Sequence, residues 1–436
     1  MAREFPSASV LENVRFNALV VVPNALKGLF KPRRRAVAAA TAAGVDGRAV
    51  GLLRGMSKSY GPGPVWVRLV GDRALLVLSR DDARRVLGGS PSPFASDPPS
   101  KRKGMTAFQP DALTISRDGP WENRRRFNEA VLDTGHEHRF ADRFAAVVGE
   151  EADRMLRSAD ADGGGELDWG RWQRAVRRIT RRVVFGDGAA DDDSLTELLG
   201  ELMDEANGMP GEPSKRLPEL MERIHGYVEA GEEGSLVGLF GEAPSDEVTK
   251  TDGQVPHWLF ASHDTLAINA FRCLALLAGH PRENGEVEAE LDRSPNGGPY
   301  LEACLHEAMR LWPTTPMLAR VTTTDVDWDG ATVPEGTQVV IVNTFMHRDP
   351  DHHEFADRFA PEAWIDGRAV DDWSFNHLSH GPQGCPGSGL ALFLGRTLIA
   401  RVLTERQIGL VNPKLDPGRP LPHMVDFFGI RIVLGN

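Results

Sequence analysis

The spacing of hydrophobic positions divides this chain into a large helical part and a small sheet. Helical periodicity covers the middle of the chain and a segment near its C-terminus. The predicted helices span residues 120–132, 137–157, 168–185, 194–207, 216–230, 256–279, 301–311 and 387–403. Shorter β-type runs flank the turn signal Gly71-Asp72 and recur later. The predicted strands span residues 65–69, 74–78, 317–323, 338–342 and 427–434. The pattern therefore indicates a mainly α fold with a small β region.

Three stretches between these elements carry expectations of their own. Asp81 precedes a short helical run and is predicted to cap a helix that ends at Leu87. Residues 90–115 are rich in Pro, Ser and Gly and predict a long loop, a kind of segment that tends to be functional in compact domains. Residues 16–22 are apolar and precede the basic segment 31–35. We expect them either to pack as an N-terminal arm or to lie on a surface as an amphipathic segment.

Composition narrows the class of protein. The 436 residues are 41% hydrophobic and 26% charged, enough apolar material for a large core. No apolar run reaches the roughly 18 residues of a membrane span. The basic residues follow the first apolar stretch, whereas in a signal peptide they precede it. Three cysteines cannot form a disulfide framework, which favours the cytosol. The formal net charge of −12 argues against nucleic acid as the main partner.

The strongest chemical signal is the segment 378–387, which reads Leu-Ser-His-Gly-Pro-Gln-Gly-Cys-Pro-Gly and leads into an apolar helix. Its glycines leave the backbone free to wrap closely around the sulfur of Cys385. Backbone N–H groups and the start of a helix near that sulfur would stabilise a thiolate. From this motif alone Cys385 is a metal ligand, a nucleophile or a buried thiol, and metal ligation is the interpretation that we favour.

Two further signals lie inside predicted helices. Glu307 and Arg310 are three residues apart and share one helix face, as in a fixed ion pair or a common surface salt bridge. Ser262, His263 and Asp264 are adjacent on helix 256–279, so they point in different directions and do not form a hydrolase triad. A mid-helix Thr265 can distort the helix locally and make room for water. Beside Asp264, it can then relay protons.

Together these motifs resemble those of the cytochrome P450 family, in the same order and over nearly the whole chain. In sequence order they are Trp121 with Arg125, the segment Ala261 to Thr265, Glu307 with Arg310, the single Arg320, and the loop of Leu378, Gly381, Cys385 and Gly387. Each motif is weak by itself, but five in order at plausible separations make a specific signal.

The resemblance implies a single cytochrome P450 domain over residues 1–436, a triangular helical prism with haem b between the long helix 256–279 and the cysteine loop. Its β-rich parts are expected mainly at 60–90, 315–345 and 420–436, and its α-rich parts mainly at 117–311 and 387–405. Cys385 would be the axial ligand of the haem iron, and Asp264 and Thr265 the catalytic proton relay. Glu307 and Arg310 would form a structural ion pair. The other expected haem-binding residues are Trp121, Arg125, Ala261, Arg320, Leu378, Gly381, Gln383 and Gly387.

Four positions depart from the family pattern. Leu378 stands in place of an aromatic residue, and Ser262 in place of the usual glycine of the oxygen-binding kink. Gln383 replaces a His or Arg, which removes one charged contact to a haem propionate. Ala363 replaces the basic residue that normally joins the ion pair, so we expect Glu307 and Arg310 to bind backbone groups instead.

The resemblance further implies a monooxygenase that uses O2 and electrons from an external donor, expected to be a ferredoxin docking on the cysteine side near Arg124 and Arg126. The substrate would be a hydrophobic small molecule. The expected lining of its pocket includes Phe108, Leu113, Met317, Leu318 and Phe427. We expect a monomeric, cytoplasmic enzyme without a membrane span, of the kind found in bacterial secondary metabolism.

Other interpretations remain at this stage. A P450-type enzyme can catalyse isomerisation, nitrene-type or coupling reactions, or use peroxide, and the chain can also be a haem or ligand-binding protein without catalysis. His347, His352, His353 and Glu354 resemble a loose metal cluster. We interpret these four as exposed polar residues of an irregular region.

Overall fold

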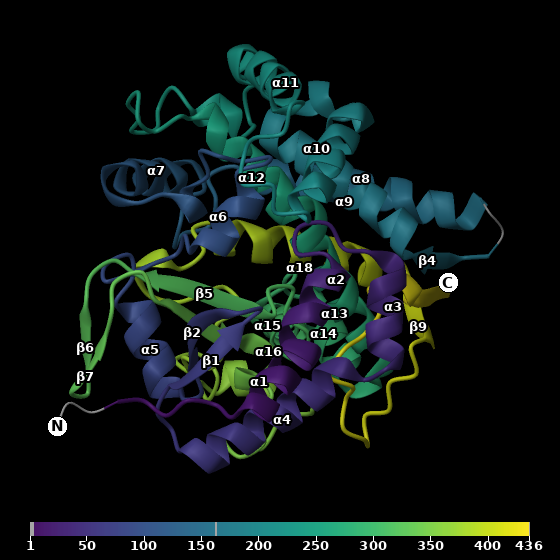
Figure 1. The fold of residues 1–436 in the computed structure, drawn as a ribbon. Coiled ribbons are helices and arrows are strands. Elements are labelled where there is room, and N and C mark those ends of the chain that lie inside the picture. Colours follow the sequence, from purple (N-terminus) through teal and green to yellow (C-terminus); the bar gives the residue numbers. More distant parts are fainter. Residues whose placement is uncertain (1–3, 162–163, 436) are drawn as a thin grey trace.

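The computed structural model describes residues 4–161 and 164–435, and helices form most of it (Figure 1). The helices are α1 (Val10–Phe16), α2 (Val22–Lys27), α3 (Arg34–Ala42), α4 (Val45–Tyr60), α5 (Arg80–Gly88), α6 (Pro99–Met105), α7 (Asp118–Val131), α8 (Ala141–Ala161), α9 (Trp169–Phe185), α10 (Asp193–Ala206), α11 (Leu217–Ala230), α12 (Val255–Phe260), α13 (Ala267–Gly279), α14 (Pro281–Leu291), α15 (Pro299–Leu311), α16 (Asn343–Met346), α17 (Glu362–Ile365) and α18 (Ser388–Glu405). Two π-helical segments, Asn17–Val21 and Ala261–Leu266, join α1 to α2 and α12 to α13.

The largest sheet combines segments from both ends of the chain. It has the order β1 (Val65–Leu69), β2 (Asp72–Val77), β8 (Gln338–Val342), β5 (Met317–Thr322) and β3 (Phe94–Ala95). β1 and β2 form the predicted hairpin, whereas β2 pairs in parallel with β8. A second sheet has the order β4 (Glu166–Asp168), β10 (Arg431–Gly435), β9 (Gln407–Asn412), and β6 (Val326–Trp328) pairs with β7 (Ala331–Val333). The larger sheet and the N-terminal helices lie on one side of the molecule, with α7 and α8 to α12 on the other (Figure 1).

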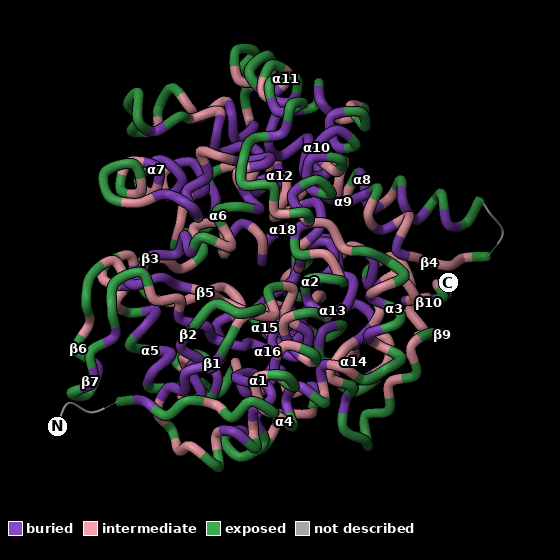
Figure 2. Tube along the Cα trace, viewed as in Figure 1, coloured by how far each residue is buried: buried purple, intermediate pink, exposed green. Residues whose placement is uncertain are grey.

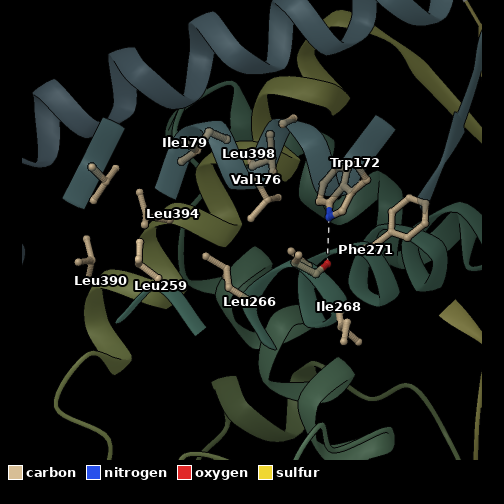
Figure 3. Packing of buried hydrophobic residues seen from close by; sticks show 14 of the residues in the cluster. Trp172, Val176, Ile179, Leu259, Leu266, Ile268, Phe271, Leu390, Leu394 and Leu398 are labelled. Atoms are coloured by element: carbon tan, nitrogen blue, oxygen red, sulfur yellow. Dashed lines mark hydrogen bonds between the residues drawn. The ribbon is translucent and has the colours of Figure 1, made fainter. Parts of the chain in front are cut away.

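A central helix made of α12, the second π segment and α13 runs through the helical part. Every residue from Ala267 to Leu277 is buried, so this helix is enclosed on all sides, as its apolar sequence indicates. The indole Nε1 of Trp172 on α9 donates to the carbonyl oxygen of Ala267 at 2.9 Å, and its ring stacks on Phe271 (Figure 3). Leu390, Leu394 and Leu398 of α18 pack in the same cluster (Figure 3). The central helix is thereby fixed between α9 and α18.

Two local predictions are wrong in instructive ways. Ser79, not Asp81, caps α5, because its hydroxyl accepts the Asp82 N–H at 3.2 Å while its own backbone is extended. The region 90–115 is not one long loop, because it contains strand β3, helix α6 and a 3-10 turn at Leu113–Ile115. Pro98 precedes α6 and Pro99 is its first residue, and proline at a helix start is compatible with the helix even though it breaks the periodic pattern.

The N-terminal segment contains helices, of which only one face is covered. Phe16 and Val20 are buried, but Val10, Val14 and Leu26 are exposed by 83%, 60% and 58%. Figure 2 shows that the outside of the molecule is otherwise mostly exposed or intermediate, as expected for a surface. One side of this segment therefore packs against the protein, as expected for an N-terminal arm. The other side is apolar and exposed to solvent, as expected for an amphipathic segment. Within residues 4–161 and 164–435, no single helix has the length and hydropathy of a membrane span, although α3 and α4 pass that test as a pair bent by 59°.

Candidate cofactor and active site

A glycine-rich loop wraps the thiol of Cys385 just before α18. Gly381 has a φ of +68°, and a Cβ at this position would collide with the backbone oxygen of Leu87. The Cys385 N–H donates to the carbonyl oxygen of Leu378 at 2.9 Å, and the Gly387 N–H donates to the Cys385 sulfur. Helix α18 begins directly after Gly387, so the positive end of its dipole lies near the sulfur. This arrangement matches the one predicted from the sequence.

Two opposing effects act on the acidity of the Cys385 thiol. Cys385 is exposed, yet the surrounding protein is dense enough that burial raises the pKa of its thiol. Arg125 on α7 opposes this effect, because its positive charge lowers the pKa of Cys385 and its Nη1 donates to the Gly384 carbonyl oxygen at 2.5 Å. A bound metal cation deprotonates a thiol in such a place. By contrast, Cys273 and Cys304 are buried in the core, where burial raises the pKa of each thiol.

Two side chains near the loop lack the partner that their burial requires. Arg320 on β5 is only 3% exposed and donates to the hydroxyls of Ser90 and Ser379 at 3.2 and 3.1 Å, with no described carboxylate within 4 Å. Burial lowers the pKa of Arg320 to about 10, so it stays charged at neutral pH. The amide Oε1 and Nε2 of Gln383 are also buried without a partner. Carboxylates placed here would accept hydrogen bonds from Arg320 and from Gln383 Nε2, so these donors fit the propionates of haem.

Helix α7 and the preceding helix α6 carry two further hydrogen-bond donors, Trp121 and Lys101. Trp121, one turn before Arg125, donates its indole N–H to no described residue. Lys101 on α6 was missed by the sequence interpretation, because it lies in the region expected to be a loop. Its Nζ donates to the carbonyl oxygens of Ser96 and Thr114 at 3.0 and 2.9 Å. Burial, together with the charge of Arg320, lowers the pKa of Lys101 to about 7, whereas the charge of Asp97 opposes the decrease.

The π segment directs neighbouring side chains of the central helix to two different sides. Ala261, Ser262 and Thr265 are partly accessible although they lie in the middle of the molecule, whereas His263 and Asp264 are buried. The Thr265 hydroxyl makes no hydrogen bond within the described chain, so it remains available to a ligand. Gly395 of α18 contacts Leu266, which places α18 against the π segment. The local distortion expected near Thr265 is therefore present, without the expected hydrogen bond from its own hydroxyl.

Asp264 faces α9 rather than the side of Thr265. Its Oδ1 accepts a hydrogen bond from Gln173 Nε2 at 3.0 Å. Burial raises the pKa of Asp264, and the charges of Arg177 and Lys31 and the bond from Gln173 oppose the increase. His263 and Asp264 line a cavity of about 140 Å³ together with Lys31, Gln173 and Arg177. The carboxyl of Asp264 is thus set between the central helix and a cavity large enough for a few water molecules.

We expect Asp264→Asn to stabilise the fold at high pH but not at low pH. The pKa of Asp264 is higher in the folded state than the unfolded value of about 3.9, so ionisation costs stability as the pH rises through the folded-state pKa. Asparagine avoids that cost. The melting temperature of the variant should exceed that of the wild type by a few degrees near about pH 8, and the difference should shrink toward about pH 5. A difference independent of pH would contradict the assignment, and Asp371→Asn at an exposed position is the control.

Glu307 and Arg310 of α15 form a fully buried ion pair. Nε and Nη2 of Arg310 donate to the two Glu307 carboxylate oxygens at 2.6 and 2.8 Å. Arg310 also donates to four carbonyl oxygens in the segment 347–358. Glu307 accepts the Ala360 N–H and the Trp364 indole N–H. Ala363 is buried and supplies no charge. The predicted replacement of the third charged partner by backbone groups is confirmed, with the Trp364 indole as an addition.

The histidines of the irregular region bind protein groups. His347 is buried and its Nδ1 lies 3.1 Å from the Arg310 carbonyl oxygen, and His353 is buried against Phe375. The expectation that all four polar residues would be exposed is therefore wrong for these two. No group of three metal-ligating side chains occurs among the described residues.

The five residues that were expected to line the substrate pocket do not all line one cavity. Phe108 is buried edge-on against Phe260 of α12, with ring centroids 5.5 Å apart. Leu113 is buried near α12, whereas Met317 and Leu318 on β5 are half-buried. Phe427 lines a separate cavity beside α13, whose lining does not include the other four. The structure thus places aromatic and aliphatic groups on several sides of the central helix.

Comparison with known proteins agrees with this geometry. The family model described as Cytochrome P450 matches residues 243–412, which include the central helix, the ion pair and the cysteine loop. Two solved structures of a zebrafish cytochrome P450 share the fold, with TM-scores of 0.68 and 0.69 and sequence identities of 22% and 19%. These matches cover 88% and 89% of this chain and 99% of each zebrafish chain. The chain has the cytochrome P450 fold, and its residues 243–412 are similar to the cytochrome P450 family.

Curated P450 relatives are distant. Cytochrome P450 81F4 of Arabidopsis thaliana is 26% identical over 78% of this chain and 77% of its own length. Cytochrome P450 3A1 of rat is 30% identical, but the match covers 34% of this chain and 32% of the rat protein. For cytochrome P450 4c3 of Drosophila melanogaster the match likewise covers only 33% of the relative. The P450 fold implies haem as the cofactor. The residues of this chain that would hold it are Cys385, Arg125, Arg320 and Gln383.

Proposed function

We propose that this P450 is a haem-thiolate monooxygenase that oxidises a hydrophobic small molecule with O2 and electrons from an external partner. The observation that carries the proposal is the Cys385 thiol, held at the start of α18, while α18 packs against the π segment that presents a free Thr265 hydroxyl. Oxygen activation at a haem requires a thiolate ligand on one face of the haem and a proton donor on the opposite face.

The roles of the protein groups follow from their positions. Haem bound through Cys385 would supply the oxidising chemistry, and thiolate donation favours O–O cleavage. Arg125, Arg320 and Gln383 would bind the propionates by hydrogen bonds, of which those from the arginines are charge-assisted. Thr265 Oγ1 would pass a proton to the cofactor side of the central helix. Asp264, whose raised pKa lets it retain a proton, would exchange that proton with water in the cavity on the other side.

The test is product formation under labelled dioxygen, with progesterone and dodecanoate as probe substrates and a ferredoxin with its reductase as the electron source. We expect one labelled oxygen atom in each product molecule. Thr265→Ala should lower product formed per electron by roughly tenfold or more, because proton delivery is lost. Thr404→Ala on the exposed side of α18 is the matched control. Oxidised product without label would favour a reaction without oxygen insertion, and product formed only with added peroxide would favour a peroxide user.

A ferredoxin-type donor remains part of the proposal, with one correction to its expected docking residues. Arg124 is buried, where it donates to Ser116 and to Asp111 at 2.8 and 2.7 Å, so it is wrong as a docking residue. Arg126 is exposed on the same helix that brings Arg125 to the cysteine loop. We therefore assign the docking role to Arg126 alone. The class of electron donor is tested by comparing a ferredoxin with a flavoprotein reductase in the labelled-dioxygen assay.

We also propose a monomeric, cytoplasmic enzyme of bacterial secondary metabolism. What supports this is composition, namely the net charge of −12 and three cysteines that are all free. The relatives named above are animal and plant proteins.

A further inference from the structure

Two basic side chains lack a partner where the N-terminal segment meets α9. Within the described residues, the side chains of Lys31, between α2 and α3, and Arg177, on α9, make no hydrogen bond and no ion pair. The Nε–H of Arg177 is also buried without an acceptor. By contrast, Arg178, Arg181 and Arg182 of the same helix each have a carboxylate within 4 Å. A buried donor without an acceptor destabilises a protein, so we expect an acceptor from outside the chain at Arg177.

Both side chains line one cavity, together with two further hydrogen-bond donors. The cavity has a volume of about 140 Å³ and lies between Lys31, α9, α10 and the π segment. His263 of the π segment is 3% exposed, and its Nε2 is buried without a partner. Thr196 of α10 accepts a hydrogen bond from Arg181 Nη1 at 2.7 Å, and no described residue accepts its own hydroxyl proton. Four donors from four segments of the chain therefore line the same small space.

The charges around this cavity favour an anion. Lys31 and Arg177 are positive, and Asp264 is the only described acidic residue in the lining. The Asp264 carboxylate does not pair with either cation, because its Oδ1 accepts from Gln173 Nε2 and no cation lies within 4 Å of it in the described chain. Two cations and at most one negative charge leave the cavity with an excess of positive charge.

His263 is suited to donate to an anion as a neutral imidazole. Burial lowers the pKa of His263 well below its usual value, and the charges of Arg177 and Arg181 lower it further. The ring is therefore neutral at neutral pH and carries a single N–H. An acceptor beside Nε2 selects the tautomer in which that nitrogen carries the proton. His263 can thus bind an anion without adding a buried charge of its own.

The size and the walls of the cavity restrict the ligand to a small one. An inorganic oxyanion has about the volume of two or three water molecules and fits with water beside it. The remaining wall is apolar and includes Trp169, Phe427 and Phe428. Water alone would accept hydrogen bonds from the donors, but it carries no charge to offset two cations.

We propose that this cavity binds a small inorganic oxyanion, such as sulfate or phosphate, through the four donors that line it. The ion would join the connection between α2 and α3 to α9, α10 and the π segment. Its charge would also oppose ionisation of Asp264, so bound anion and a protonated Asp264 favour each other. The site is separate from the cysteine loop, and the proposal does not rest on the monooxygenase function.

The test is binding of sulfate and of phosphate to the haem-loaded protein. Calorimetric titration is combined with melting temperatures in the sodium salts of sulfate, phosphate and chloride at equal ionic strength. We expect one sulfate or phosphate ion per chain and a melting temperature that rises to a plateau with either ion but not with chloride. Sulfate also stabilises proteins in general by exclusion from their surface, but that effect does not reach a plateau and does not depend on single residues.

Arg177→Gln and Lys31→Gln should each weaken binding of the ion about tenfold or more, because a charge-assisted hydrogen bond is lost. Neither substitution should lower the melting temperature in chloride, since neither side chain has a partner to lose. Arg174→Gln is the matched control, because Arg174 is exposed on the same helix and does not line the cavity. It should bind the ion as the wild type does.

Three results would overturn the proposal. They are a wild type that binds sulfate and phosphate no better than chloride, binding that persists in both cavity variants, and equal weakening by Arg174→Gln. The last result would mean that general surface charge attracts the ion. The wild-type titration and Lys31→Gln, which changes a residue outside any helix or strand, keep the test decisive even when Arg177→Gln fails to fold. Because the readout is binding, its outcome is independent of oxygen turnover.

Discussion

Cys385→Ser is expected to abolish the strongly red-shifted Soret band that a reduced haem-thiolate protein shows with carbon monoxide. A serine hydroxyl does not replace the thiolate, because its proton is far harder to remove and its oxygen donates less electron density to iron. The measurement is the absorbance spectrum of the reduced, carbon monoxide-treated variant beside the wild type. Turnover in the labelled-dioxygen assay should fall by roughly a thousandfold or more, which corresponds to about 4 kcal/mol in the barrier.

Cys273→Ser is the matched control for this result. Cys273 is buried on α13 without a role at the loop, so its variant should keep the red-shifted band even where its stability falls. An unchanged spectrum in Cys385→Ser would mean that the ligand is another residue, and the assignment of the whole site would then fail.

Glu307→Gln is expected to lower the free energy of unfolding by about 3–5 kcal/mol. The substitution keeps the shape of the side chain but leaves the Arg310 charge buried with only carbonyl oxygens around it. The segment 347–364, which both residues hold, leads directly to the cysteine loop, so the variant should also retain less haem. Denaturant unfolding followed by fluorescence and by haem absorbance measures both effects.

Glu302→Gln on the same helix is the control, because Glu302 is half exposed and lies 3.6 Å from Arg396. Its loss should change stability by less than about 1 kcal/mol. A Glu307→Gln variant as stable as this control would show that the carbonyl contacts of Arg310 suffice without the carboxylate.

Much of the cysteine side of the site could be predicted from the sequence, because local spacing determines it. The glycine at 381 and the helix after 387 lie within one short segment, and both are present as expected, although the close approach of Leu87 to Gly381 could not be predicted. Glu307 and Arg310 are likewise one helical turn apart. The central helix was predicted as 256–279 and spans Val255 to Gly279, interrupted by its π segment.

What could not be predicted depends on contacts between distant segments. Arg124 looks like part of an exposed basic run, but Asp111 and the carbonyl of Thr249 enclose it. The partly covered N-terminal helices lack a clean apolar face, which is the signal that sequence patterns use.

The parallel pairing of β2 with β8 also constrains how the protein is made. Ala74 on β2 pairs with Gln338 on β8, so a ribosome must add 264 residues before β2 can meet its parallel neighbour (338 − 74). At about 5–20 residues per second this takes tens of seconds. During that time the apolar side chains of Leu75, Leu76 and Val77 have only the β1 hairpin partner for cover. Until β8 emerges, the nascent chain therefore stays soluble only if chaperones cover these side chains or if aggregation is slower than synthesis.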